Sequence, residues 1–268
     1  MGKFDGVLLV SDFDDTYFGL NHLVPARNLE ALDYFRGQGG KFTIATGRAR
    51  RTFAPQLGLM PLDAPVVLSN GSALYDFGEN RMLEQTFLPR EAPEHFRALF
   101  QRFPALGVET YCGEAISVWN PNPITDAHMK KVGTDYTVRL LAEMPLPWSK
   151  AILQQEHPLL LEAQAWLLGR YGDRYEAIFS NQYYLEVTRK GSTKGGMVDR
   201  LVEHLGVDPG KLYCVGDNQN DIPMLERSAI PFAPANCAQE VKDWGARVLC
   251  HCDDGVIGDI VDILDGIY

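Results

Sequence analysis

The sequence has no long hydrophobic run. None of its apolar segments approaches the roughly 20 residues that a membrane-spanning helix needs. The first residues, MGKFDGVLLVSDFDD, carry one lysine, a short apolar run and then acids, whereas an export signal needs a longer apolar region and a cleavage site of small residues. We therefore expect no transmembrane helix, no membrane partner and a cytoplasmic location.

Cysteines are few, and their number is odd. The five are scattered along the chain, which is typical of reduced thiols in a cytoplasm and not of a disulfide framework. Cys250 and Cys252 flank His251, a spacing that could serve a soft metal ion. Because the sequence offers no second Cys/His pair at ligand spacing, we expect surface-loop thiols there and no zinc site.

The chain also lacks an excess of positive charge. It has 25 Lys and Arg residues against 35 Asp and Glu residues, a formal net charge of -10. Proteins that bind nucleic acids need a basic surface to displace phosphate counterions, so we expect no nucleic-acid partner. A local basic pocket can still bind a small anion, so the net charge limits the size of the partner and not its sign.

The apolar segments that are present alternate with helical patterns. Five stretches end in small or polar residues and are typical of buried strands: 6–11, 41–47, 64–71, 211–218 and 229–236. Three segments have apolar residues at helical spacing: 25–37, 193–206 and 220–228. This alternation predicts an α/β fold with a Rossmann-like, doubly wound parallel sheet.

Residues 78–187 have a different pattern. Adjacent short strands near 72–88, 107–120 and 175–188 accompany helices near 91–103 and 158–171. Such paired strands predict an antiparallel sheet backed by helices, hence an inserted α+β domain within a core formed by residues 1–77 and 188–268. The Pro-rich stretches 120–126 and 142–150 are predicted to be connections.

Polar clusters follow several of the predicted strands or open a predicted helix: Asp12 with Asp14, Thr46, Lys194, and Asp217 with Asp221. Each alone is a weak signal, because an acid after a strand is more often a helix cap or a solvated turn. An open α/β sheet, however, brings its strand ends to one edge. Carboxylates gathered there repel one another unless they share a cation or a proton. We therefore expect Mg²⁺ as the cofactor, because it prefers a few carboxylate oxygens and keeps sites for phosphate.

These residue types suit phosphoryl transfer. Asp12, the first acid after the apolar run, is the expected nucleophile, because aspartate can form an aspartyl-phosphate. Asp14 is the expected acid/base, near enough to serve the departing oxygen and the attacking water. Lys194 supplies positive charge, Thr46 a hydroxyl donor, and Gly47 lets main-chain amides approach the phosphoryl oxygens.

The segments DFDDT, ATGR, STKGG and GDNQND resemble, in this order, the four motifs of haloacid dehalogenase-like phosphatases. The long insert between the second and third segments is similar to the branch that holds Cof-type sugar phosphatases and sucrose-phosphate phosphatases. The resemblance covers both core segments and is only general in the insert. It implies a Mg²⁺-dependent phosphomonoester hydrolase with a cap domain, which acts on a small phosphorylated metabolite, a sugar phosphate, through an aspartyl-phosphate.

The resemblance also implies residue roles. Asp12 would be nucleophile and metal ligand, and Asp14 the acid/base, with its main-chain carbonyl on Mg²⁺. Thr46 and Lys194 would bind the phosphoryl group. Asp217 would be a direct metal ligand.

Other assignments are less settled at this point. By the same resemblance Asp221 would lie among or beside the metal ligands, and Asn220 beside the metal and the phosphate. Asn70 matches a position near the substrate phosphate, although an Asn-Gly turn that closes a strand explains it equally well. Arg48 could contact substrate, but we favour a structural ion pair near the start of a helix. Asp15 stands where relatives commonly have Gly, and we favour a turn.

In the insert, Glu186 is expected to be a hinge residue or an acid near the metal ligands. Trp119, His128, Lys130 and Lys131 are conceivable specificity contacts. Because single aromatic and basic residues are usually packing or solvated surface, we do not predict them as site residues.

Alternatives remain for the reaction. A phosphomutase would use the same chemistry and return the phosphoryl group to substrate, and a phospho-accepting signalling protein would form the acyl phosphate without turnover, although such modules are much shorter. A P-loop nucleotide triphosphatase is disfavoured, because the sequence has no G-x-x-x-x-G-K-[ST] loop. The leaving group is not specified, and a monomer or a homodimer is expected.

Overall fold

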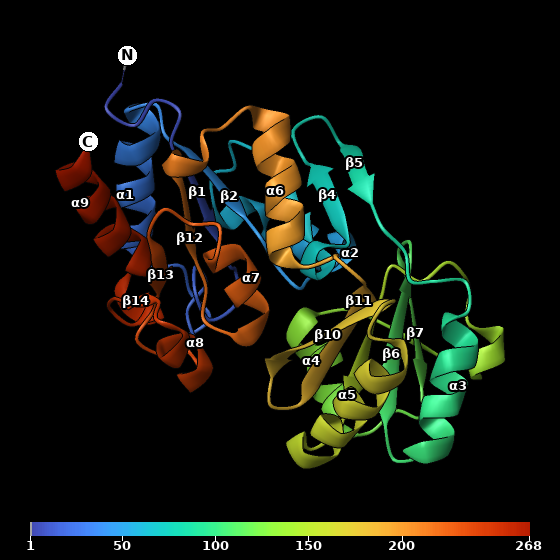
Figure 1. Ribbon diagram of the computed structural model, residues 1–268. Coiled ribbons are helices and arrows are strands. Elements are labelled where there is room, and N and C mark those ends of the chain that lie inside the picture. Colours follow the sequence, from blue (N-terminus) through green and yellow to red (C-terminus); the bar gives the residue numbers. More distant parts are fainter. Residues whose placement is uncertain (1) are drawn as a thin grey trace.

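The structure, a computed structural model, describes residues 2–268, which form two lobes (Figure 1). The lobe that holds both termini is built on a five-stranded sheet in which all neighbouring strands are parallel. The strand order is β14 (Arg247–Val248), β13 (Pro231–Ala233), β12 (Leu212–Val215), β1 (Leu8–Ser11) and β2 (Lys41–Ile44). The predicted α/β class with a Rossmann-like parallel sheet is confirmed.

Helices cover both faces of this sheet, because successive residues of a strand point to opposite sides. Leu9 of β1 packs in the cluster that includes residues of α1 and α9, whereas Leu8 and Val10 pack in the cluster that includes residues of α6. Burial on both faces explains why β1 is apolar along its length. The helices of this lobe are α1 (Ala26–Gly37), α2 (Arg50–Phe53), α6 (Lys194–Leu205), α7 (Ile222–Leu225), α8 (Gln239–Trp244) and α9 (Val256–Ile267).

The stretch 64–71 differs from its prediction as a full strand of the parallel sheet. Its strand β3 (Val66–Leu68) joins that sheet through a single parallel bridge, Ala45 to Val67, and pairs antiparallel with β4 (Ala73–Asp76). β4 in turn pairs with β5 (Arg81–Gln85). The predicted antiparallel sheet of the insert includes both strands, although the predicted boundary at 78 leaves β4 in the core segment. Their pairing through β3 attaches both to the core lobe. The boundaries at 78 and 187 stay a prediction, and this pairing favours a division after β5.

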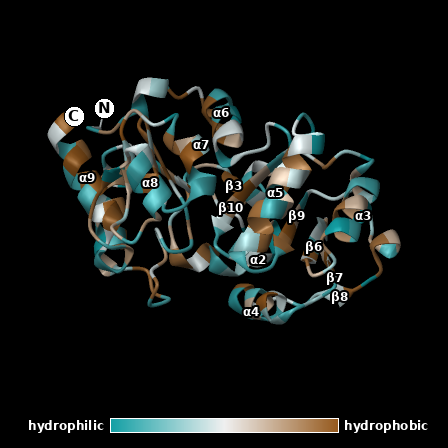
Figure 2. Cartoon of the chain, turned by 60° about the horizontal axis from the view of Figure 1, so that its bottom comes forward, coloured by the Kyte–Doolittle hydropathy of each residue, from teal (hydrophilic) through white to brown (hydrophobic). Residues whose placement is uncertain are grey.

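The second lobe contains a six-stranded sheet. Its order is β10 (Tyr175–Asn181), β11 (Tyr184–Arg189), β9 (Lys150–Gln154), β6 (Gly107–Cys112), β7 (Ala115–Trp119) and β8 (Thr137–Val138), with all pairs antiparallel except β7 with β8. The helices α3 (Ala92–Arg102) and α5 (His157–Tyr171) share a hydrophobic core with this sheet. Figure 2 shows the hydrophobic residues of β6 and β9 within the lobe, and hydrophilic residues along much of α4 (Pro123–Val132).

Both Pro-rich stretches were predicted to be connections, and each contains part of a regular element. α4 begins at Pro123, directly after its N-cap Asn122, whose side chain accepts the N–H groups of Ile124 and Thr125. Proline is favoured at the first helical position, where its missing N–H would have no partner in the helix. The other stretch ends in β9, which starts at Lys150.

Several short turns of 3-10 helix connect these elements. Turns of 3-10 helix lie at Ala54–Leu59, Ser69–Gly71, Leu141–Glu143, Pro209–Lys211, Gln219–Asp221 and Cys252–Asp254. The five cysteines are free thiols. Among residues 2–268, none of the helices has both the length and the apolar character that a bilayer crossing requires.

Polar contacts join the two lobes around their common face. Arg50 of α2 pairs with Glu114 at 2.8 Å, and the hydroxyls of Thr86 and Ser192, which belong to the two connecting segments, lie 2.8 Å apart. Lys150 of β9 donates to the main-chain carbonyl of Gly47 at 2.9 Å. The insert therefore lies against the loop that follows β2.

Candidate active site

Strand register brings the predicted motifs together. Ser11, the last residue of β1, lies opposite Ile44 of β2 and Val215 of β12. Asp12 follows at once, and its N–H donates to the carbonyl of Val215. Because all three strands run in parallel, their next residues leave the sheet at the same edge. Those residues include Asp12 and Asp14, Thr46 and Gly47, and Asp217.

Lys194 is the charged centre of this edge. It opens α6 after the N-cap Thr193, is 1% exposed, and donates to Asp12 Oδ1 and Asp221 Oδ1, both at 2.5 Å. Burial alone lowers the pKa of Lys194, but the two carboxylates outweigh it and hold the pKa above its ordinary value. The side chain is therefore a buried ammonium that faces two acids.

The carboxylates form a set that fits a hard cation. Oxygens of Asp12, Asp217 and Asp221 all lie within 4.8 Å of one another. Burial, reinforced by the neighbouring Asp221, raises the pKa of Asp12 to about 7 despite the opposing effect of Lys194. Burial and the charge of Asp12 also raise the pKa of Asp217 well above its usual value. Ionisation of these carboxyl groups is unfavourable without a cation, and the site offers only oxygen ligands, so it suits Mg²⁺.

The carboxylates of this set differ in how many hydrogen bonds they accept from the protein. Asp221 Oδ2 accepts the main-chain N–H groups of Asp217 and Asn218 at 2.9 and 3.0 Å, while its Oδ1 accepts from Lys194. Asp217 Oδ1 accepts the Thr16 hydroxyl at 3.2 Å. Both oxygens of Asp221 thus accept from protein donors, whereas no residue in 2–268 makes a hydrogen bond to Asp217 Oδ2.

Asp14 is held by Arg48. The guanidinium makes two hydrogen bonds to the carboxylate, Nε to Oδ2 at 2.8 Å and Nη2 to Oδ1 at 2.7 Å. Burial raises the pKa of Asp14, but the hydrogen bonds and charge of Arg48 outweigh it and lower the pKa below the usual value. The structural ion pair that we favoured for Arg48 is present, and its partner is the predicted acid/base.

The predicted phosphate-binding residues Thr46 and Asn70 lie side by side, and the main-chain N–H of Asn70 donates to the carbonyl of Thr46 at 3.1 Å. Thr46 is buried, and a Cβ added to Gly47 would come within 3.2 Å of Asn70 Nδ2. Asn70 has a left-handed backbone (φ 54°), as an Asn-Gly turn requires, and its Oδ1 accepts from Asn220 Nδ2 at 2.9 Å. Within residues 2–268, Asn70 Nδ2 finds no hydrogen-bond partner although it is buried. The predicted Asn-Gly turn is therefore present, and the role of Asn70 beside the substrate phosphate stays a prediction.

The insert supplies the opposite wall. A pocket of about 130 Å³ is lined by Asp12, Asp14, Arg48, Asp217 and Asn220 from the core, and from the insert by Tyr111, His128, Lys131, Lys150, Tyr184 and Glu186. Sequence reasoning considered and set aside His128 and Lys131, and missed Tyr111, Lys150 and Tyr184. Their positions along the chain carry no shared motif, because separate strands and a helix bring them together.

Two acids outside the cluster also have partners from the insert. Asp15 has φ 63°, in keeping with the predicted turn, and its carboxylate lies 3.6 Å from Lys131. Glu186 was expected to be a hinge residue or an acid near the metal ligands. It pairs with Lys150 at 3.0 Å, so its buried charge is compensated within the insert wall. Trp119 stacks on Phe100 at 4.4 Å, the packing role that we expected.

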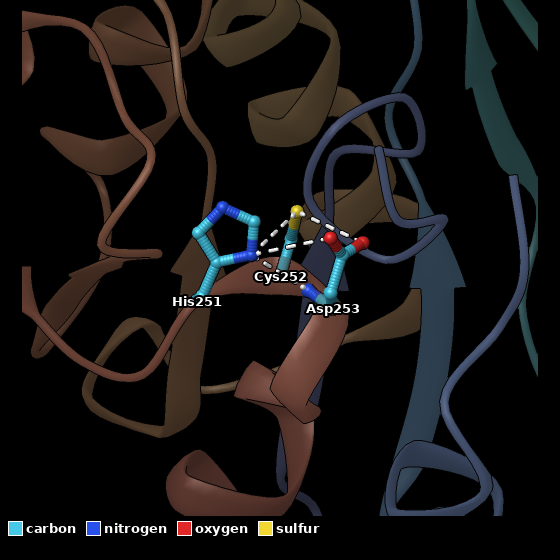
Figure 3. A group of neighbouring side chains, drawn as sticks. All are labelled: His251, Cys252 and Asp253. Carbon is cyan, nitrogen blue, oxygen red and sulfur yellow. Dashed lines mark hydrogen bonds and ion pairs between the residues drawn. The ribbon is translucent and has the colours of Figure 1, made fainter. Parts of the chain in front are cut away.

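A second cluster of possible metal ligands lies near the C-terminus. Figure 3 shows His251, Cys252 and Asp253 side by side, with His251 Nδ1 3.7 Å from Cys252 Sγ and 3.5 Å from Asp253 Oδ2. The same Nδ1 accepts the main-chain N–H of Asp253 at 3.2 Å, so its lone pair caps a 3-10 turn and is not directed at a metal. Burial raises the pKa of the Cys252 thiol to about 11. The expected surface position is wrong for Cys252, which is buried, and we propose no zinc site there.

Comparison with known proteins shows the family to which the chain belongs. The profile of the haloacid dehalogenase-like hydrolases matches residues 9–260, nearly the whole chain. The chain belongs to this family. The resemblance seen in the four motifs is thereby confirmed, and the chain is an enzyme.

Named relatives of this haloacid dehalogenase-like hydrolase are phosphatases. It is 23% identical to the 5-amino-6-(5-phospho-D-ribitylamino)uracil phosphatase YwtE of Bacillus subtilis (strain 168), over 96% of this chain and 98% of that protein. It is 26% identical to the HMP-PP phosphatase of Serratia proteamaculans (strain 568), over 93% and 92%. The expectation of a phosphatase is confirmed at this level.

The fold is shared with solved structures. The HAD subclass IIB sugar phosphatase BT4131 superposes with a TM-score of 0.85 at 22% identity, covering 98% of this chain and all of that one. TM0651 from Thermotoga maritima superposes with a TM-score of 0.76 at 20% identity, covering 96% and 97%. The relation extends over both lobes, the insert included.

Proposed function

We propose that this hydrolase is a Mg²⁺-dependent phosphomonoesterase for a small phosphorylated metabolite, a sugar phosphate, and that it works through an aspartyl-phosphate. The observation that carries the proposal is the buried Lys194 between Asp12 and Asp221, with Asp217 beside them in a pocket that the core and the insert line together. A buried cation next to unpaired carboxylate oxygens suits a phosphoryl group bound with a divalent ion.

Asp12 is the proposed nucleophile. One of its oxygens accepts from Lys194, which leaves Oδ2 to attack phosphorus. Mg²⁺, held by Asp12, Asp217 and the main-chain carbonyl of Asp14, would neutralise charge on the phosphoryl oxygens and favour ionised Asp12. Lys194, Thr46 and the unpartnered Asn70 Nδ2 would bind phosphoryl oxygens, with Gly47 leaving room for them.

Asp14 is the proposed acid/base. It would protonate the departing oxygen, then take a proton from the water that attacks the aspartyl-phosphate. The ion pair with Arg48 lowers the pKa of Asp14, so proton donation requires the carboxyl group to separate from the guanidinium. We propose that Asp221 and Asn220 position Lys194 and Asn70, because each makes a direct hydrogen bond to that residue.

The wall of the insert supports a hydroxylated leaving group. Lys150 is paired with Glu186, and Lys131 with Asp15, so the wall offers donors and acceptors with little net charge. A hydroxyl group both donates and accepts, which suits such a wall. Tyr111 and Tyr184 add apolar ring surface for the carbon skeleton. The phosphatases YwtE, HMP-PP phosphatase and BT4131 are named for small phosphorylated compounds or sugars, which agrees with this class.

A phosphate-release assay tests the proposal. With Mg²⁺ the purified protein is expected to release phosphate from pentose and hexose phosphates, and EDTA is expected to remove that activity, because three neighbouring carboxylates need the ion to bind a phosphodianion. Release of phosphate that is insensitive to EDTA, or no release from any sugar phosphate, would contradict it. An isomeric sugar phosphate in place of free phosphate would identify a phosphomutase.

A further inference from the structure

A fully buried carboxylate of the insert takes no part in the mechanism above. Glu109 of β6 is 0% exposed and accepts from His128 Nδ1 at 2.8 Å and from the Tyr111 hydroxyl at 2.9 Å. The Gln154 side chain also donates to it. A buried carboxylate is weak support for stability, because the cost of its desolvation offsets the hydrogen bonds that it accepts. Its position next to the pocket points to another role.

His128 connects this carboxylate to the pocket. It lies on α4, its side chain is 12% exposed, and it lines the pocket beside Tyr184, whose ring centroid is 4.8 Å away. A carboxylate only accepts, so the hydrogen of the imidazole is on Nδ1, toward Glu109. Nε2 is then the free polar atom of the ring, and no residue in 2–268 makes a hydrogen bond to it.

Hydrogen bonds on the side of His128 that faces away from the pocket fix the position of its imidazole. Gln154 donates to Glu109 and accepts from the Thr125 hydroxyl at 2.5 Å, and Thr125 belongs to the same helix as His128. The N-cap Asn122 also binds the carbonyl of Gln154 at 3.1 Å. One network thus ties α4, β6 and β9 together and sets the ring orientation.

We propose that His128 is a specificity-determining residue whose Nε2 binds a hydroxyl group of the leaving group, and that Glu109 is the positioning residue that holds its tautomer and orientation. The inference rests on the proposed function and names the side chain that recognises the sugar hydroxyl. His128 faces Asp14 and Asp217 across the same pocket, so a compact polyol phosphate can reach both walls at once.

Two variants test the proposal, with kinetics on two substrates. His128→Gln removes the ring nitrogen from the pocket, and Glu109→Gln keeps the volume but weakens the hold on Nδ1. The first substrate is a sugar phosphate, whichever of erythrose 4-phosphate, ribose 5-phosphate and glucose 6-phosphate is cleaved best. The second is p-nitrophenyl phosphate, whose leaving group has no sugar hydroxyls. Loss of a hydrogen bond to the substrate is expected to lower the ratio of kcat/KM for the sugar phosphate to kcat/KM for p-nitrophenyl phosphate ~10- to 100-fold. The change is expected mainly as a higher KM for the sugar phosphate.

The matched control is His204→Gln, which removes an exposed imidazole of α6. It is expected to leave the ratio at the wild-type value. If the ratio in both variants stays within about twofold of wild type while thermal unfolding shows that they are folded, the proposal is overturned. An equal loss on both substrates also overturns it, because a structural role would act on both.

A direct readout covers the case in which His128→Gln does not fold. The imidazole nitrogen signals of the wild-type protein are recorded in Mg²⁺ with and without the non-hydrolysable phosphonate analogue of ribose 5-phosphate. They are expected to show a shift of one histidine, whose signal is perturbed in Glu109→Gln. No shifted histidine signal at saturating ligand contradicts the proposal. Failure of the proposed function is separate: it would show as absent Mg²⁺-dependent turnover of both substrates by the wild-type protein.

Discussion

Asp12→Asn is expected to abolish phosphate release, with kcat at least ~10⁴-fold below that of the wild-type enzyme. The amide is a poor nucleophile and carries no negative charge, so the variant would lose both the attacking oxygen and a metal ligand. The change is nearly isosteric at a buried position, which limits its effect on packing. Initial rates with saturating Mg²⁺ and a sugar phosphate measure the loss.

The control for this experiment is Asp243→Asn on the exposed surface of α8, which is expected to retain wild-type kcat. Circular dichroism and thermal unfolding establish that both variants are folded. An Asp12→Asn enzyme with more than about a tenth of wild-type kcat would remove Asp12 from the role of nucleophile.

Lys194→Met is expected to reduce both activity and stability. Activity falls because the ammonium that faces the phosphoryl group is gone. Stability falls because Asp12 and Asp221 lose the cation between them, and breaking a buried pair costs about 3–5 kcal/mol. Urea unfolding of the metal-free protein at pH 7 measures the second effect, and phosphate release with Mg²⁺ measures the first.

The stability loss of Lys194→Met depends on pH. The pKa of Asp12, about 7 in the folded protein, is raised above its unfolded value near 3.8, so its stabilising contribution is complete below the unfolded pKa and is lost as pH rises through 7. Without Lys194 the pKa of Asp12 rises further, because an opposing charge is removed. The deficit relative to wild type is therefore expected to be larger at pH 7 than at pH 5.

Lys242→Met on the exposed side of α8 is the matched control, and it is expected to unfold at the wild-type urea concentration. A Lys194→Met protein as stable as wild type at pH 7, or one whose deficit grows toward pH 5, would contradict the ion-pair geometry described here.

The core could be predicted from the sequence because its signals are local. β1 is apolar along its length since both faces are covered, and the acid directly after it marks the strand end. Parallel register then places the residues after β2 and β12 beside Asp12. Order along the chain and the geometry of a parallel sheet were sufficient to expect that these distant motifs meet.

The insert could not be predicted to the same depth, because its contacts depend on which strands become neighbours. Glu109 and His128 are separated by a hairpin and a helix start, and no local pattern says that an imidazole would point toward a buried acid. Both Pro-rich stretches are predicted to be connections, although proline also starts helices, as Pro123 does. β4 and β5 are predicted to pair within the sheet of the insert for a similar reason: antiparallel pairs look alike wherever they pack, and only the pairing with β3 shows that they lie with the core.

The most direct test of the account is to trap the phosphoryl group on the protein. Wild-type enzyme mixed with Mg²⁺ and excess sugar phosphate is quenched in acid within the first turnover, and the digested peptides are weighed by mass spectrometry. We expect one phosphoryl group on the peptide that contains Asp12, and none in the Asp12→Asn variant. Turnover without any such adduct, or an adduct on another residue, would contradict the central claim.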